Sequence, residues 1–139
     1  MGKTTLWEAG IGAARESGFR NLTARASGAE AEMSFAALTD LMEGVELGSL
    51  QSVPSPQRRA LEVALLRVEP DGQPPSSRAI ALGFLNVIRS LSGSGPVLIA
   101  VDDLQSLDQA SREVLAFAMR RLHSESIVFL LARRAGDAT

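Results

Sequence analysis

The first residues of the chain have the types and the order of a phosphate-binding site. Gly2, Lys3, Thr4 and Thr5 follow Met1 directly. In a phosphate-binding loop, backbone N–H groups surround the β-phosphate, a lysine reaches the β- and γ-phosphates, and the first hydroxyl is a ligand of Mg²⁺. Glycine is needed because the backbone passes close to the phosphate oxygens. We predict that these four residues bind ATP and that Thr4 also binds Mg²⁺; the alternative is a charged helix start.

Two adjacent acids form the second candidate group. Asp102 and Asp103 follow the apolar run PVLIAV, which has the length and composition of a strand buried on both faces. Two carboxylates at the end of such a strand need a partner such as a cation. In P-loop ATPases the first acid holds Mg²⁺ through its water shell, and the next one orients the attacking water. We predict Asp102 as a metal-binding residue and Asp103 as a catalytic residue; the alternative is that both cap the following loop.

A cation ends the last apolar run of the chain. Arg133 and Arg134 follow the segment SIVFLLA, which we predict to be a second buried strand. A guanidinium at the end of that strand would lie near the γ-phosphate and could neutralise charge in the transition state. We predict Arg133 as a catalytic residue; the alternative is an ordinary solvated pair of arginines.

These residues need elements that bring them to one end of a sheet. Helix-forming residues extend from Lys3 to about Ser17, where Gly18 can end a helix, and alternating apolar residues predict a short strand over 21–26. Capping residues and apolar residues at helical spacing predict further helices over 35–45, 55–68, 78–91 and 108–122. Alternating helices and apolar strands favour a parallel sheet between helices. The predicted fold class is α/β, a three-layer αβα P-loop NTPase-like fold.

Two further features are easily mistaken for parts of a site. The segment LSGSG at 91–95 resembles a transporter ATPase signature, but it abuts Pro96 at the start of a strand, so we interpret it as a turn. Trp7 lies on the first predicted helix. We expect it to pack in the core; stacking on a nucleotide base is the alternative.

Composition limits the classes of protein to which the chain can belong. Its 139 residues are one domain, residues 1–139, with 45% hydrophobic residues and a net charge of −2. The weak negative charge disfavours direct binding to nucleic acid. The chain has no cysteine, which excludes disulfides and thiolate metal sites and fits a reducing cytoplasm. It also lacks an apolar run long enough to span a membrane.

The longer segments resemble a known family. Together they are similar to the ATPase module of large bacterial LuxR-type transcriptional regulators, in the signal-transduction branch of AAA-related ATPases. The similarity covers nearly the whole chain and rests on these segments: GKTTL, ARASGAEAEMSFAALTDLM, PVLIAVDDLQSLDQASREVLAFAMRRL and VFLLARR. The resemblance implies a slow, ATP-driven switch that controls a distant DNA-binding domain, absent from this chain. It also implies the same roles for Lys3, Thr4, Asp102, Asp103 and Arg133.

The chain departs from the family pattern at its start. The motif G-x-x-x-x-G-K-[ST] requires a glycine five residues before Gly2, and this sequence has none. We therefore expect a fragment truncated within the phosphate-binding loop, lacking the strand before that loop and later strands. That strand would lie beside SIVFLLA, so we expect an exposed apolar sheet edge that supports self-association. For the same reason we expect this chain alone to bind ATP weakly or undetectably.

Two other functions are weighed against an ATP-dependent switch. A degenerate P-loop domain could bind a protein partner without nucleotide, and replacement of Lys3 would distinguish the two. A small-molecule kinase needs a lid with clustered arginines, and the loop PDGQPPSS offers none. We rank the kinase last.

Overall fold

A three-stranded parallel sheet lies at the centre of the computed structural model, which describes residues 2–70, 72–123 and 126–133, without the side chains of residues 2–5. The elements in chain order are α1 (Gly2–Glu16), β1 (Arg20–Arg25), α2 (Ala36–Leu41), α3 (Ser55–Ala64), α4 (Ser77–Ser92), β2 (Val97–Asp102), α5 (Gln109–Arg121) and β3 (Ile127–Leu131), with 3-10 turns at Gly28–Glu30, Leu47–Ser49 and Leu104–Ser106. The α/β class predicted from the sequence is confirmed, and the architecture is that of an incomplete P-loop NTPase-like fold.

The strand order is β1-β2-β3, and both neighbouring pairs are parallel. Every residue of β2 is buried, because this strand has a neighbour on each side and helices on both faces. The pairing places Arg25 beside Asp102 at the C-terminal ends of β1 and β2. Since parallel strands end at the same edge of a sheet, this edge collects the residues that follow each strand.

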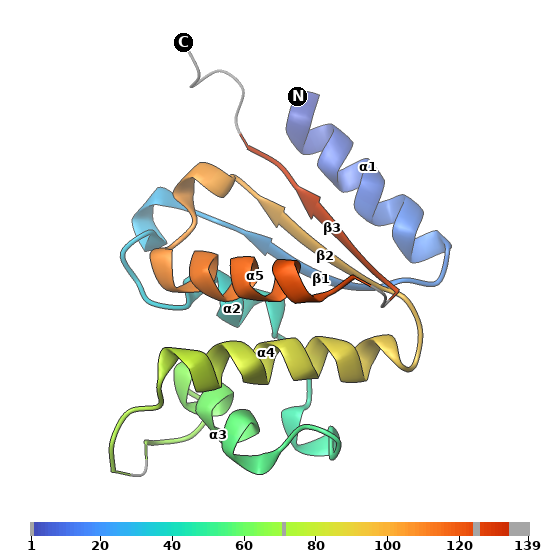
Figure 1. The fold of residues 1–139 in the computed structure, drawn as a ribbon. Helices are drawn as coiled ribbons and strands as arrows, with labels where there is room; N and C mark the ends of the chain where they lie inside the picture. The colour runs from blue at the N-terminus through green and yellow to red at the C-terminus, as the bar shows by residue number, and fades with distance from the viewer. Residues whose placement is uncertain (1, 71, 124–125, 134–139) are drawn as a thin grey trace.

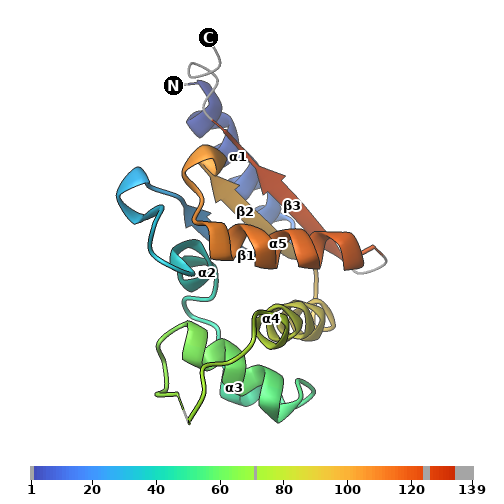
Figure 2. The ribbon, with the colours of Figure 1, turned by 60° about the vertical axis from the view of Figure 1, so that its left-hand side comes forward.

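Helices cover the two faces of the sheet unequally. On one face α1 packs alone, and its Trp7 and Ile11 contact Leu98 and Ala100 of β2. The alternate residues of β2 point to the opposite face, where the other four helices form the larger core (Figures 1 and 2). The chain therefore has three layers, with α1 forming one outer layer.

The local sequence predicts the C-terminal end of α1 but not that of α2. The first helix ends as predicted, because Gly18 takes a φ of 88° and the N–H of Phe19 bonds to the carbonyl of Ala14 at 2.9 Å. The second helix is shorter than predicted: α2 ends at Leu41 instead of reaching Val45.

Two of the residues that follow α2 are buried although they are not helical. Met42 and Val45 are both in the core, and their carbonyl oxygens accept hydrogen bonds from the Arg67 guanidinium at 2.6 and 2.8 Å. A distant side chain thus satisfies backbone groups that a longer helix would otherwise pair. Between Met42 and Val45, Gly44 takes a φ of 86°, which favours glycine.

The last strand differs from the prediction of a second fully buried strand. Among the described residues β3 pairs only with β2, so it lies at an edge of the sheet. Val128 is 48% exposed and Leu131 37% exposed. The apolar sequence predicted the strand correctly, and the exposed apolar sheet edge expected at SIVFLLA is confirmed, because β3 has a described neighbour on one side only.

Candidate functional site

Asp102 is a buried carboxylate at the C-terminal end of β2. Its side chain is only 4% exposed, and its Oδ1 accepts a 2.9 Å hydrogen bond from the N–H of Asp103. Its Oδ2 lies 3.2 Å from Arg25 Nε, an ion-pair distance without the alignment of a hydrogen bond. A buried carboxylate oxygen with no hydrogen-bond donor among the described residues is suited to a further electropositive partner.

Arg25 is the residue that sequence reasoning missed. It ends β1, and its guanidinium contacts three residues on two other elements, α1 and β2. Besides the contact with Asp102, NH2 lies 3.3 Å from Glu8 Oε2, and Cζ lies 5.2 Å from the centroid of the Trp7 ring. The signal in the sequence was the position of Arg25 at the end of a predicted strand, at the same sheet edge as the acids.

Trp7 is buried beneath this arginine. Its side chain is 6% exposed and packs between α1 and the sheet, as expected for a core residue. The indole Nε1 has no hydrogen-bond acceptor among the described residues. The contact with the Arg25 guanidinium over its ring is a cation–π interaction.

Asp103 occupies a constrained turn directly after Asp102. Its φ and ψ of 58° and 52° are left-handed, a conformation that aspartate tolerates better than most residues. The carbonyl of Asp103 accepts the N–H of Ser106 at 2.9 Å, and Gln105 Nε2 lies 3.2 Å from Asp103 Oδ1. The carboxylate is partly exposed, so water can reach it.

The backbone after β3 is fastened to this turn. The N–H of Ala132 donates to the carbonyl of Val101, and the carbonyl of Ala132 accepts from the N–H of Leu104, each at 2.9 Å. These two bonds lie on either side of the acid pair. Arg133, the next residue, is therefore close in space to Asp103, and its side chain is exposed.

The phosphate-binding residues lie in the first turns of α1. The backbone of Gly2, Lys3, Thr4 and Thr5 is helical, while their side chains lie outside the described part of the structure. The start of α1 is at the same end of the sheet as the C-terminal ends of the strands (Figures 1 and 2). The contact between Glu8 and Arg25 agrees with this placement.

The described residues can be tested for their fit to a bound Mg²⁺. Among them, no three carboxylate or imidazole groups gather at one point. Mg²⁺ keeps several waters and takes one or two carboxylate ligands together with phosphate oxygens. The buried Oδ2 of Asp102 is an oxygen of the required type, so the site fits the ion.

An acidic group lies beside the cluster around Arg25. Asp40 lines a pocket of about 350 Å³ next to β1, together with Trp7, Arg25 and Glu43. Partial burial raises the pKa of the Asp40 carboxyl, and the negative charges of Glu30 and Glu43 raise this pKa further. The described side chains of Asp102, Asp103 and Arg133 do not line this pocket.

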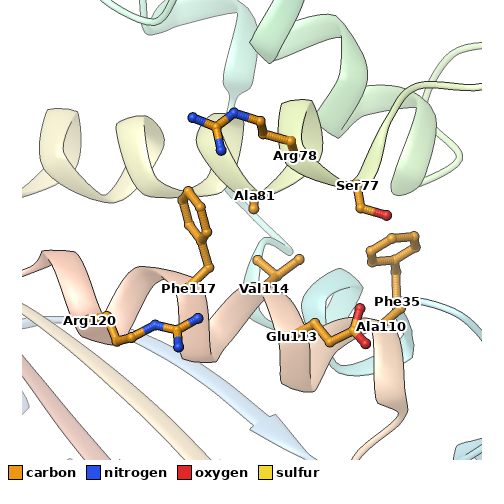
Figure 3. A pocket seen from close by; sticks show the side chains of 9 residues that line it. All are labelled: Phe35, Ser77, Arg78, Ala81, Ala110, Glu113, Val114, Phe117 and Arg120. Carbon is orange, nitrogen blue, oxygen red and sulfur yellow. The ribbon is translucent and has the colours of Figure 1, made fainter.

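A second pocket lies away from the sheet edge. It has a volume of about 260 Å³ between α4 and α5, and its lining includes Phe35, Phe117, Arg78 and Arg120 (Figure 3). In Figure 3 the two phenylalanine side chains extend from the α5 side toward α4. The described side chains of Asp102, Asp103 and Arg133 do not line it either.

Comparison with known proteins adds one match. The model of a family described as the AAA ATPase domain matches residues 1–131, and no curated protein and no solved structure matches the chain. This family binds ATP through a P-loop module, in agreement with the residues at the edge of the sheet. In the described part of the chain, no helix is both long and apolar enough to cross a bilayer.

Proposed function

Because the chain belongs to the AAA ATPase domain family, we propose that it binds Mg²⁺–ATP at the C-terminal edge of its sheet. The observation that carries the proposal is the buried Oδ2 of Asp102, which lacks a hydrogen-bond donor among the described residues. It lies at the end of the sheet from which α1 starts. The positive end of the α1 dipole then faces the phosphates.

The residues at the start of α1 are proposed to bind the phosphates. The N–H groups of Gly2 to Thr5 donate to phosphate oxygens, and the Lys3 ammonium neutralises charge on the β- and γ-phosphates. Thr4 is one helical turn before Glu8, and residues four apart share a helix face. The contact of Glu8 with Arg25 supports a position of Thr4 on the side of α1 that faces Asp102.

The two acids have separate proposed roles. Asp102 and the Thr4 hydroxyl would hold Mg²⁺, and when bound the ion would neutralise charge on the β- and γ-phosphates. Asp103 accepts a hydrogen bond from the attacking water and so orients it. The left-handed turn supports this role, because it fixes the direction in which the partly exposed carboxylate leaves the backbone.

Arg133 is proposed to respond to the γ-phosphate. Its backbone follows Ala132, which is bonded on either side of the acid pair. An exposed guanidinium at this place can reach a phosphate at the sheet edge and neutralise charge that develops during hydrolysis.

We further propose that the module is the switch of a LuxR-type transcriptional regulator in the bacterial cytoplasm. The sequence resemblance supports this context. In such a protein, ATP binding would control a separate DNA-binding domain, and the present chain would not touch DNA itself. The net charge of −2 supports the last point.

Replacement of Lys3 tests the nucleotide proposal. NMR titration of the 139-residue chain with Mg²⁺–ATP should give saturable binding in the wild-type protein. Lys3→Ala should weaken this binding at least tenfold, because it removes the positive charge that contacts the phosphates. Arg15→Ala, in the last turn of α1, is the control. Equal binding by the wild-type chain and Lys3→Ala would contradict the proposal.

A second candidate is a protein-interaction module that uses no nucleotide. The observation in its favour is the edge strand β3, where Val128 and Leu131 are exposed. An apolar strand edge can pair with another chain, including a second copy of this one. Sedimentation that depends on protein concentration, together with no response to ATP, would favour this candidate.

A further inference from the structure

We propose that Arg25 is a positioning residue that holds Asp102 until a divalent cation displaces it. The inference rests on the proposed function in assigning Asp102 to a cation. It goes further in naming Arg25 as the group that competes with the cation for the Asp102 carboxylate. It also states that Arg25 keeps its contact with Glu8 when it leaves Asp102. Its basis is the set of contacts that Arg25 makes with Asp102, Glu8 and Trp7.

The buried negative charge of Asp102 is compensated by Arg25. The carboxylate is 4% exposed, and a carboxylate so buried is costly unless a positive group compensates it. Arg25 Nε, at 3.2 Å from Oδ2, supplies this compensation. A cation near the same carboxylate would be repelled by the guanidinium, so the two compete.

Arg25 has other contacts that it can keep when a cation displaces it from Asp102. Its guanidinium uses Nε toward Asp102 and NH2 toward Glu8, at 3.2 and 3.3 Å. The Glu8 carboxylate is largely exposed, and the Arg25 side chain is about half exposed. When a cation takes Asp102, Arg25 can keep its ion pair with Glu8 and its place over the Trp7 ring. Its release therefore does not leave an unpaired charge.

Trp7 can report the binding of a cation at Asp102. Trp7 is the only tryptophan, and the chain has no tyrosine. The Trp7 ring lies 5.2 Å from Arg25 Cζ, and Arg25 Nε lies 3.2 Å from Asp102 Oδ2, so a cation at Asp102 would lie near the indole. Terbium(III) is an oxygen-seeking cation whose luminescence is excited by a nearby indole, which makes it a suitable probe.

The experiment is a double-mutant cycle read by terbium luminescence. The four proteins are wild type, Arg25→Gln, Asp102→Asn and the double variant. Arg25→Gln should lower the Tb³⁺ concentration for half-maximal emission about tenfold, because a competing charge is removed. The same change in the Asp102→Asn background should alter it less than twofold. Comparing the effect of Arg25→Gln with and without the Asp102 carboxylate separates Tb³⁺ bound at Asp102 from Tb³⁺ bound at Asp40 and Glu43, which also lie near Trp7.

The conservative variant and a stability measurement separate positioning from a structural role. Arg25→Lys keeps the charge and should bind Tb³⁺ nearly as weakly as wild type. A purely structural Arg25 would lower the unfolding temperature of Arg25→Gln without raising its Tb³⁺ affinity. Equal affinity in wild type and Arg25→Gln, an equal gain in the Asp102→Asn background, or no emission from Arg25→Gln would overturn the proposal.

A measurement on unaltered Arg25 covers the case in which Arg25→Gln does not fold. Titration of the wild-type chain with Mg²⁺ should shift the NMR signal of the Arg25 Nε–H group, and Asp102→Asn should abolish the shift. No shift in wild type would overturn the inference. A positive result without ATP binding would reject the proposed function alone, whereas ATP binding with a flat terbium cycle would reject only the role of Arg25.

Discussion

Single residues tie distant parts of this chain together, and Asp108 is the clearest case. It is 3% exposed and accepts N–H groups from Phe35 at 2.8 Å, Ala37 at 3.0 Å and Ser111 at 2.9 Å. The sequence predicted Asp108 as the cap of the helix that follows it. The structure adds that the same carboxylate also binds the start of α2, more than 70 residues earlier.

Asp108→Ala is expected to lower the free energy of unfolding by about 3 kcal/mol. The change removes a helix cap and leaves two further backbone donors without an acceptor. Urea unfolding measures the loss. Ser76→Ala is the matched control, because Ser76 caps α4 through one exposed bond to Ala79 and should cost only about 1 kcal/mol. Equal losses in the two variants would contradict the role of Asp108 in holding α2.

Asp40 gives the chain a specific pH dependence. Burial and the charges of Glu30 and Glu43 raise its pKa above the usual 3.8, so the folded state binds this proton more tightly than the unfolded state. Its contribution to stability is therefore favourable at low pH and is lost as the pH rises through the raised pKa. Asp40→Asn should increase the unfolding temperature at neutral pH and have little effect below pH of about 3.9. A lower unfolding temperature at neutral pH would contradict this sign.

Between elements, α3 and α4 approach each other closely at Gly83. A Cβ at this position would lie 2.5 Å from the carbonyl oxygen of Gln57 and 3.3 Å from Leu61 Cβ. Backbone atoms cannot move away as a side chain can. Gly83→Ala should therefore force the helices apart and lower the free energy of unfolding by about 2 kcal/mol.

Gly12 in α1 is the matched control for Gly83. A Cβ there would meet nothing within 4 Å. Gly12→Ala should raise the free energy of unfolding by up to about 1 kcal/mol, because alanine favours a helix. Urea unfolding of the two variants should thus give changes of opposite sign, and a stabilised Gly83→Ala would show that α3 and α4 are not in close contact.

The elements also show what sequence alone can predict. The apolar run of β2 identified both the strand and the acids at its end, because a fully buried strand needs apolar residues on both faces. The end of α2 was not predictable, since Arg67 satisfies the carbonyls of Met42 and Val45 from more than 20 residues away. Arg25 was missed for a similar reason: its contact with Asp102 depends on the register of two strands.

At the scale of the whole molecule, the parallel sheet is what gathers the candidate site. The C-terminal ends of β1, β2 and β3 bring Arg25, Asp102 and the residue before Arg133 to one edge, to which α1 also points its first turn (Figure 1). Among the described side chains, those of Asp102, Asp103 and Arg133 do not line the pocket between α4 and α5. A bound nucleotide is therefore expected to lie at this one edge.

The most direct test maps where the nucleotide binds on the 139-residue chain. Paramagnetic Mn²⁺–ATP, added at millimolar concentration to compensate for weak binding, should broaden the amide NMR signals of the start of α1 together with those of Arg25, Asp102 and Asp103. Lys3→Ala and Asp102→Asn should each reduce this broadening. Broadening centred on the pocket between α4 and α5, or no selective broadening in the wild-type chain, would contradict the account.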